Sequence, residues 1–578
     1  MRQLSGADSM FLQFERRNNF MHVASLAIYD PSTASGGGVR FKDVLRFFAS
    51  RVSQFPQFRR RLVTLPLSLD RPYWVEAARI DVEFHVRHIA LPHPGDWRQL
   101  CIQVARLHSR PLDRSKPLWE AYVIEGLHNV TGVPPGSFAL YTKLHHAIVD
   151  GESATELMKA LHSLTPEPFD LDAEEAHSAA TVFHADPEPS ATDLYSRALL
   201  HNVSRLPTLA RLSLQTARKV ASLGADALAS HRRDGEDNLL ANLRSVLTGD
   251  LSSLIPRMPP QTRFSRDVSA HRVFEAVSIP LAAFREVRKQ VPRATINDQF
   301  LCIVGGALRA YLSDKNELPD ATLIAMVPMT LRGDDKAGDG GNQVGFTVMP
   351  VHSDVEDPIE RLRAIVDSAE KSKRVTNAIG KELARDLLET LPAIVAEPLL
   401  RNAQVPRIGL IVSNVRGPDV PLYMAGAQLV HYVPISIAID GMGINITAFS
   451  YAGNMWICAI SCREMLPDPA FFADCMRTAF EQMQEGARRE AAFTVADTAS
   501  GTTAAVAAEP ADTAVARARH SGRKRKVRAV GTGTPRPARR AKPSGATAKP
   551  KSGRRKPSTA ARRTATPEPD TVTDREDT

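Results

Sequence analysis

The sequence predicts an α/β fold with more than one domain. At 578 residues the chain is too long for one ordinary core, and its 43% hydrophobic residues can fill larger ones. Segments with the alternation of strands are interleaved with segments that have the period of helices. Because such interleaving is typical of α/β domains, we expect strands and helices to pack in layers.

The N-terminal elements follow one another closely. We expect strands at 23–29, 74–89 (a pair), 118–127 and 137–146. We expect helices at 41–52 and 97–107. Pro56 should end the first helix, and a Gly/Pro loop separates the last two strands.

The middle of the chain is expected to connect two domains. Residues 165–190 are rich in Pro, Ala, Ser and acids without an apolar period, which predicts an exposed linker. Residues 194–228 have the leucines of a long helix that Pro207 should kink or divide, and 234–263 are expected to be irregular.

A second α/β domain is expected to follow. Its predicted elements are strands at 271–279, 323–329, 344–351, 408–414, 435–439, 444–450 and 455–461, and helices at 281–291, 295–312 and 467–483. The predicted organisation is an N-terminal domain at 1–164, a connecting region at 165–265, a C-terminal domain at 266–495 and a tail at 496–578.

The tail accounts for the basic character of the protein. From Gly501 to Thr578 there are 19 Lys/Arg and 7 Asp/Glu, a net charge of +12, so the rest carries about −3 of the total of +9. A segment of Ala, Thr, Pro, Gly, Lys and Arg cannot bury enough apolar surface to fold, so we expect disorder. Three roles stay open: a solvated extension, a tether to anionic lipid, and nucleic-acid binding.

Other features bear on location. The chain has no run of about 18 apolar residues, and its N-terminus lacks the pattern of a signal peptide. Five cysteines are scattered, which predicts reduced thiols and a cytoplasmic setting.

One segment is the main candidate for a catalytic site. It is residues 140–151, Leu-Tyr-Thr-Lys-Leu-His-His-Ala-Ile-Val-Asp-Gly. Its pattern is typical of a strand that enters a tight loop. Because strand side chains alternate between faces, His146 should lie on the mostly apolar inner face, and His145 on the other. Asp150 and Gly151 would then turn the chain.

Three interpretations of His146 stay open. A buried neutral imidazole can act as a general base, because its ordinary pKa lies near neutrality. Asp150 would then fix the ring tautomer or order the loop by pairing with an arginine. A core histidine beside an Asx turn has the same pattern, and a metal ligand would need neighbours that the segment does not supply. Ser153 and Glu156 have the spacing of a capping box for the next helix.

Two further segments have alternative explanations. Thr295 and Asp298 have capping-box spacing, so Asn297-Asp298 is either structural or substrate-binding. The glycine-rich loop 338–342 is either a plain turn or a phosphate-binding loop, and it lacks the residues of a P-loop.

Several motifs in order resemble one family. They are Leu4-Ser5-Gly6-Ala7-Asp8, Met21-His22-Val23, the block from Pro111 to Glu120, His145-His146-Ala147-Ile148-Val149-Asp150-Gly151, Asn297-Asp298, the block from Ser413 to Pro418, and Pro421-Leu422-Tyr423. Together they resemble the bacterial wax ester synthase/diacylglycerol acyltransferase (WS/DGAT) family of the CoA-dependent acyltransferase superfamily, over residues 1–490. Lys116 and Arg416 depart from the family pattern, which usually has Arg and Pro there.

The resemblance implies two chloramphenicol-acetyltransferase-like α/β sandwich domains with a central channel. It implies His146 as general base, Asp150 as the residue that orders the loop, Gly151 at the turn and His145 in support. The implied reaction needs no metal and no cofactor, since acyl-CoA is a substrate.

The expected function is transfer of a long-chain acyl group from acyl-CoA to diacylglycerol. The alternative acceptor is a long-chain alcohol, giving a wax ester. A lipid or nucleic-acid binder without activity and transfer between carrier proteins are further alternatives. We expect peripheral association with a membrane or lipid-droplet surface.

Overall fold

The computed structural model describes residues 1–77, 79–148, 158, 160–166, 186–205, 207, 211, 259–330, 344–379 and 407–506. The chain divides into two units, Met1–Ala507 and Ala508–Thr578, and all the described residues belong to the first. The predicted tail therefore lies outside the described residues, except that the last helix extends past residue 496. The predicted domain boundaries stay a prediction.

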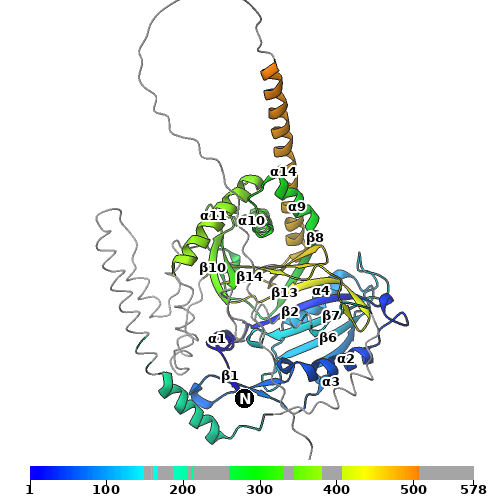
Figure 1. The fold of residues 1–578 in the computed structure, drawn as a ribbon, viewed down its shortest axis with the longest axis vertical. Coiled ribbons are helices and arrows are strands. Elements are labelled where there is room, and N and C mark those ends of the chain that lie inside the picture. Colours follow the sequence, from blue (N-terminus) through cyan, green and yellow to red (C-terminus); the bar gives the residue numbers. More distant parts are fainter. Residues whose placement is uncertain are drawn as a thin grey trace, which may run out of the picture. The chain divides into compact units, whose positions relative to one another are not determined.

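A six-stranded mixed sheet forms the first lobe, in the order β12-β13-β2-β7-β6-β5 (Figure 1). The strands are β2 (His22–Asp30), β5 (Val86–Ala90), β6 (Trp119–Glu125), β7 (Phe138–His145), β12 (Tyr423–Met424) and β13 (Ala427–Ile435). Strand β7 is central, because it pairs antiparallel with β2 on one side and with β6 on the other.

Helices and a small sheet complete this lobe. The helices are α1 (Gly6–Phe14), α2 (Phe41–Gln54), α3 (Val82–His85), α4 (Trp97–His108) and a helix at 191–205, and the small sheet is β1 (Arg2–Gln3), β4 (Tyr73–Glu76) and β3 (Arg60–Val63). Short 3-10 helices are η1 (Pro31–Thr33), η2 (Pro56–Phe58), η3 (Pro66–Ser68), η4 (His146–Ile148) and η6 (Arg263–Ser265). Asp96 starts α4 by accepting the Gln99 backbone N–H at 2.8 Å.

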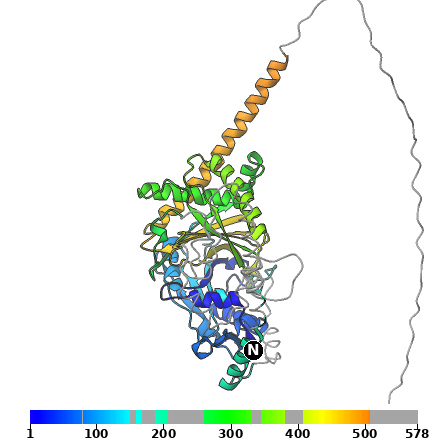
Figure 2. The same ribbon diagram turned by 90° about the vertical axis from the view of Figure 1, so that its left-hand side faces the viewer.

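The second lobe has its own six-stranded sheet, in the order β10-β9-β11-β14-β15-β8. Its elements are β8 (Arg272–Pro280), α9 (Leu281–Gln290), α10 (Ile296–Asp314), β9 (Ile324–Thr330), β10 (Val344–Pro350), α11 (Pro358–Ile379), β11 (Leu410–Arg416), β14 (Ile444–Tyr451), β15 (Asn454–Cys462) and α14 (Pro469–Val506). Figures 1 and 2 show the helices gathered on one side of this sheet, where they share its largest apolar core.

Strand β13 joins the lobes. It comes from the C-terminal half but pairs antiparallel with β2 of the first sheet, from Gln428 opposite Asp30 to Ile435 opposite Ala24. Apolar residues of both sheets, including Leu26 and Trp456, then form one buried cluster. The expected α/β fold is confirmed, although sequence alternation did not predict the exchange of strands between sheets.

One element prediction was wrong in detail. The strand expected at 435–439 lies earlier, as β13, because the alternation continues through 427–435. The two strands expected within 74–89 are present as β4 and β5. They belong to different sheets, and the helix α3 lies between them.

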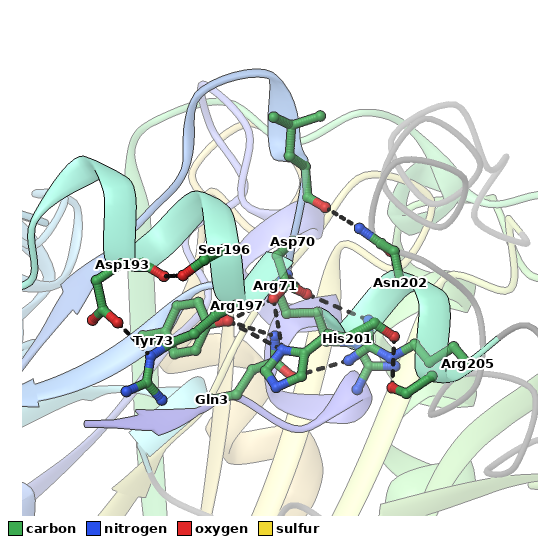
Figure 3. A network of polar contacts seen from close by, with 12 residues as sticks. Gln3, Asp70, Arg71, Tyr73, Asp193, Ser196, Arg197, His201, Asn202 and Arg205 are labelled. Atoms are coloured by element: carbon green, nitrogen blue, oxygen red, sulfur yellow. Dashed lines mark hydrogen bonds and ion pairs between the residues drawn. The ribbon is translucent and has the colours of Figure 1, made fainter. Parts of the chain in front are cut away.

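The helix at 191–205 is attached to the small sheet through a buried carboxylate (Figure 3). The side chain of Asp70 lies 2.5 Å from the Tyr73 hydroxyl and 2.9 Å from Nδ1 of His201. Arg205 of the same helix also reaches Asp70, at 3.4 Å. These bonds fix the inner face of the helix, where Leu194 is buried against the sheet.

Candidate active site

The two adjacent histidines lie where β7 ends. All eight residues of β7 are buried, and His146 begins the 3-10 turn η4. The His146 backbone N–H donates to the carbonyl of Met21 at 2.7 Å, which ties the turn to the start of β2. The turn therefore leaves the sheet at a fixed position.

The expected alternation does not describe this site. His145 was expected on the less buried face, but it is 1% exposed, whereas His146 is partly exposed. Alternation assigns an inner face only if the other face meets solvent, and α4 covers the other face of β7. Because β7 ends at His145 and His146 belongs to η4, the alternation of strand side chains does not apply to His146. The orientation of its side chain is set by the 3-10 turn.

His145 holds the turn through both ring nitrogens. The Ala147 backbone N–H donates to Nδ1 at 3.0 Å, so Nδ1 is unprotonated and Nε2 carries the hydrogen. Nε2 then donates to the Glu15 carboxylate at 3.2 Å. Burial lowers the pKa of His145, although Glu15 opposes this shift, so the ring is neutral at neutral pH.

Glu15 joins three distant segments at this point. It follows α1, accepts from His145 of β7, and forms an ion pair with Arg114. Burial alone would raise the pKa of Glu15, but its interactions with His145 and Arg114 lower it overall. A charged Glu15 is therefore the stable partner of His145.

An aromatic ring covers His146. Phe11 of α1 stacks on the imidazole with ring centroids 4.0 Å apart and an interplanar angle of 11°. Phe11 belongs to an apolar cluster with residues of both lobes, namely Met21, Ile408, Ile411, Ile439 and Met442. Partly buried Phe14, Ile324, Met326, Val348 and Ile437 pack against the same cluster. His146 thus lies beside an apolar region that both lobes build.

A layer of buried polar residues lies behind the histidines. Lys143 is fully buried and donates to the carbonyls of Leu107 and Arg110 at 3.2 and 3.0 Å, near the end of α4. One ring nitrogen of His22, Nε2, lies 2.7 Å from the His108 carbonyl oxygen. Burial lowers the pKa of His22 and His108 well below the usual range.

Little in the sequence indicates this support. Sequence patterns do not predict the role of Glu15, because no pattern links a residue after α1 to β7. His22 stands out only as part of the Met21-His22-Val23 motif, and strand alternation places Lys143 on the outer face. The one available signal was the largely apolar strand 138–144 around Lys143, since a lysine buried in such a strand requires buried acceptors.

The segment Asn297-Asp298 lies at the start of α10. Asp298 accepts the backbone N–H and the hydroxyl of Thr295 at 2.8 and 2.7 Å, so the expected capping box is present. The Asn297 side chain accepts from Asn414 of β11 at 3.3 Å. These bonds support the structural interpretation, and a role in substrate binding stays a prediction.

Replacing Asp298 with alanine should lower the free energy of unfolding by about 1 kcal/mol, because the carboxylate that completes the capping box of Thr295 is lost. Chemical denaturation measures this change. If Asp298 acts only as a cap, the KM for both substrates should stay at the wild-type value; a raised KM in the folded variant would favour substrate contact.

The other predicted site residues lie outside the described part of the chain. These are Asp150 and Gly151, with the caps Ser153 and Glu156 and the glycine-rich loop at 338–342. Their roles stay predictions. Within the described residues there is no group of three or more His, Cys, Asp or Glu side chains that could hold a metal ion.

Comparisons with known proteins agree with this geometry. Residues 4–300 match the family model of the wax ester synthase/diacylglycerol acyltransferase catalytic domain, and residues 340–484 match the WS/DGAT C-terminal domain. The Mycobacterium tuberculosis protein named "Probable diacyglycerol O-acyltransferase tgs2" is 34% identical over 467 residues, which cover 80% of this chain and 94% of that protein. O-acyltransferase WSD of Acinetobacter baylyi is 32% identical over 481 residues, covering 81% and 93%.

A solved structure shows the same fold. The wax ester synthase/diacylglycerol acyltransferase from Marinobacter aquaeolei VT8 is 26% identical, with a TM-score of 0.55, over 84% of this chain and 99% of that one. The chain has two α/β lobes and paired histidines at the end of β7, and it matches the catalytic domain of this family. The protein is therefore an acyltransferase. It belongs to the wax ester synthase/diacylglycerol acyltransferase family.

Proposed function

We propose that the protein transfers a long-chain acyl group from acyl-CoA to the hydroxyl of diacylglycerol, forming triacylglycerol and CoA. The observation that carries this proposal is the position of His146 against Phe11, beside apolar residues of both lobes. Such a region favours acyl chains, because each buried CH₂ contributes about 0.8 kcal/mol. The names of the relatives support the same reaction.

The proposed mechanism is direct transfer. His146 takes the proton of the acceptor hydroxyl while the hydroxyl oxygen attacks the thioester carbonyl. The tetrahedral oxyanion collapses, the carbon–sulfur bond breaks, and the proton on His146 goes to the CoA sulfur. No acyl-enzyme forms, and no cofactor is needed, because the thioester is already activated.

Supporting residues have positioning roles in this proposal. His145 and Glu15 hold the turn, as their hydrogen bonds suggest. Asp150 orders the loop after His146, and Gly151 allows the chain to turn closely there. Asn297 and Asp298 hold the start of α10 near β11.

A long-chain alcohol is the second candidate acceptor. The family name includes wax ester synthase. The name of the Acinetobacter relative, O-acyltransferase WSD, does not state the acceptor. An alcohol and diacylglycerol both present a hydroxyl on an apolar chain, so the same mechanism would give a wax ester.

The test is release of CoA thiol from long-chain acyl-CoA with each acceptor in turn. We expect release to require an acceptor and His146, and to be faster with diacylglycerol. Faster release with the alcohol would make wax ester synthesis the main activity. No release with either acceptor, from folded protein, would contradict acyl transfer to lipid hydroxyls.

We further propose peripheral contact with a lipid surface through the helix at 191–205. The helix buries one face against the small sheet but exposes Tyr195, Leu199, Leu200 and Val203, at 45–68% each. Leu67 is 85% exposed. No described helix is long and apolar enough to cross a bilayer. The basic tail would add attraction to anionic lipid or nucleic acid.

Replacing Leu199 and Leu200 with serine should weaken binding to phosphatidylcholine vesicles at least tenfold, because each inserted leucine contributes about 1.5–3 kcal/mol. Co-sedimentation in high salt, which screens the tail, measures this directly. Val420→Ser, at another exposed apolar residue, is the control. Equal binding by all three proteins would contradict this surface.

A further inference from the structure

The small sheet β1-β4-β3 lies between the helix at 191–205 and the turn η4 of the candidate active site. Successive side chains of a strand point to opposite faces of the sheet. Tyr73 of β4 belongs to a buried apolar cluster with Leu194 of the helix, whereas the next residue, Trp74, belongs to a cluster with Ala147 of η4. The sheet therefore has one face against the helix and the other against the turn.

Trp74 is the largest member of the cluster that faces the turn. It is 6% exposed, and its cross-strand neighbour Leu62 of β3 packs against the same cluster. Ile148 of η4 packs there as well. The other members are Leu4, Leu12, Leu112, Leu118 and Ala147. Phe11 covers His146 from α1, so the turn is held by α1 at its first residue and by the Trp74 cluster at the next two.

On the opposite face, polar bonds hold the helix against the sheet (Figure 3). Asp70 is 2% exposed and accepts from the hydroxyl of Tyr73, the residue before Trp74, and from Nδ1 of His201 in the helix. Burial and the hydrogen bond to Asp70 raise the pKa of Tyr73, so its hydroxyl keeps the proton that it donates. One carboxylate therefore joins β4 to the helix at the position next to Trp74.

Two further bonds fix the helix along the sheet. The side chain of Asn202 donates to the carbonyl of Leu69 at 2.8 Å, and Arg205 donates to the side chain of Gln3 in β1 at 2.9 Å. Gln3 is the cross-strand neighbour of Tyr73. The helix therefore holds β1 and β4 together from the face that points away from the turn.

We propose that the helix and the small sheet form a positioning unit for η4, in which Trp74 supports the turn and Asp70 holds the sheet. The inference rests on the proposed role of His146 as general base. A general base must lie within hydrogen-bond distance of the hydroxyl that it deprotonates, and a displacement of about 1 Å can lower the rate about 100-fold. Because protein interiors are densely packed, a shift of the sheet moves the turn that rests on it.

The unit should act on the chemical step and not on substrate binding. Neither Trp74 nor Asp70 belongs to the apolar cluster of Phe11 beside His146, where we expect the acyl chain to bind. Loss of either side chain should therefore lower kcat and leave KM unchanged. A residue with only a structural role would lower stability without this division between kcat and KM.

The first variant is Asp70→Ala, which removes the bonds between sheet and helix at the face that points away from η4. We expect kcat for CoA thiol release, with the faster of the two acceptors, to fall about tenfold. KM for both substrates should stay at the wild-type value. Asp70→Asn keeps an oxygen that can accept from Tyr73, so it should restore much of the lost kcat.

The second variant, Trp74→Phe, tests the face toward the turn. Phenylalanine keeps an apolar ring but has a smaller volume, so it reduces the contact with the turn without introducing a polar group. We expect the same pattern as for Asp70→Ala, a lower kcat with an unchanged KM.

Asp468→Ala is the matched control. Asp468 also binds a tyrosine hydroxyl and a cation, those of Tyr311 and Lys315 at 2.5 and 2.6 Å, but in the second lobe, just before α14. Its loss should lower the free energy of unfolding and leave kcat unchanged. Chemical denaturation of the control and of Asp70→Ala gives the stability changes with which the two kcat values are compared.

Hydrogen exchange gives a readout that needs no turnover. The backbone N–H of His146 donates to the carbonyl of Met21, and that of Ala147 donates to Nδ1 of His145, so their exchange reports how firmly the turn is held. Mass spectrometry of a peptide that spans 138–148 measures this exchange in the folded protein.

We expect faster exchange in this peptide for Asp70→Ala and Trp74→Phe, and wild-type exchange for Asp468→Ala. This result supports the positioning unit even without detectable acyl transfer, which would count against the proposed function alone. Wild-type exchange in both variants of the unit, wild-type kcat in both, a raised KM without a lower kcat, or an equal loss of kcat in the control would overturn the inference.

Discussion

His146→Ala is expected to lower the rate of acyl transfer by roughly 10²–10⁴-fold, the usual contribution of a positioned general base. Alanine cannot accept the hydroxyl proton, so the attacking oxygen would have to lose it to water. The measurement is CoA thiol release with saturating diacylglycerol, because saturation separates the chemical step from binding.

The variant should stay folded. It loses the stacking of Phe11 on the imidazole, which is worth about 0.5–1.5 kcal/mol, against a typical stability of 5–15 kcal/mol. A thermal melt close to that of the wild type, with lost turnover, is therefore the expected pair of results. Wild-type turnover would show that another group takes the proton.

Local signals in the sequence located the paired histidines at the end of a strand, but not the contacts that support them. Local signals were enough for the helix start at Thr295 and for the strand that ends at the paired histidines, because caps and alternation depend on neighbouring residues. His145 was placed wrongly, since its buried environment includes Glu15 after α1, which is distant in sequence. The bond between Glu15 and His145 joins residues 130 positions apart, and no local rule predicts it.

The same limit explains the departures in the fold. Alternation cannot tell which sheet a strand joins, so β13 was assigned to the C-terminal domain although it pairs with β2. The pairing matters for the site, because it helps bring Ile439 and Met442, which follow β13, beside Phe11 of α1. The apolar region near His146 therefore arises from an exchange of strands between the two halves of the chain.

Glu15→Ala is expected to lower kcat by up to about 100-fold, although Glu15 does not touch the reacting atoms. Without the carboxylate, Nε2–H of His145 is buried without its acceptor, which costs about 1–3 kcal/mol. His145 can then rotate or change tautomer, and Nδ1 no longer holds the Ala147 N–H. A shift of about 1 Å in the turn that carries His146 is enough for such a loss.

Two variants separate positioning from a general loss of stability. Glu15→Gln keeps an oxygen that can accept from His145, so it should recover much of the activity. Arg114→Gln removes only the partly exposed partner of Glu15, so it should change stability by less than about 1 kcal/mol. Failure of glutamine to restore any activity would point to the charge of Glu15 and not to its hydrogen bond.

The pH dependence gives a further check on Glu15. Its pKa is lowered in the folded state, so its contribution to stability is complete above the ordinary value of 4.5 and is lost as the pH falls through the lowered value. The difference in unfolding free energy between wild type and Glu15→Gln should therefore be constant near neutrality and shrink in acid. A difference that grows in acid would contradict a charged Glu15 bound to His145, because only a carboxylate loses this interaction on protonation.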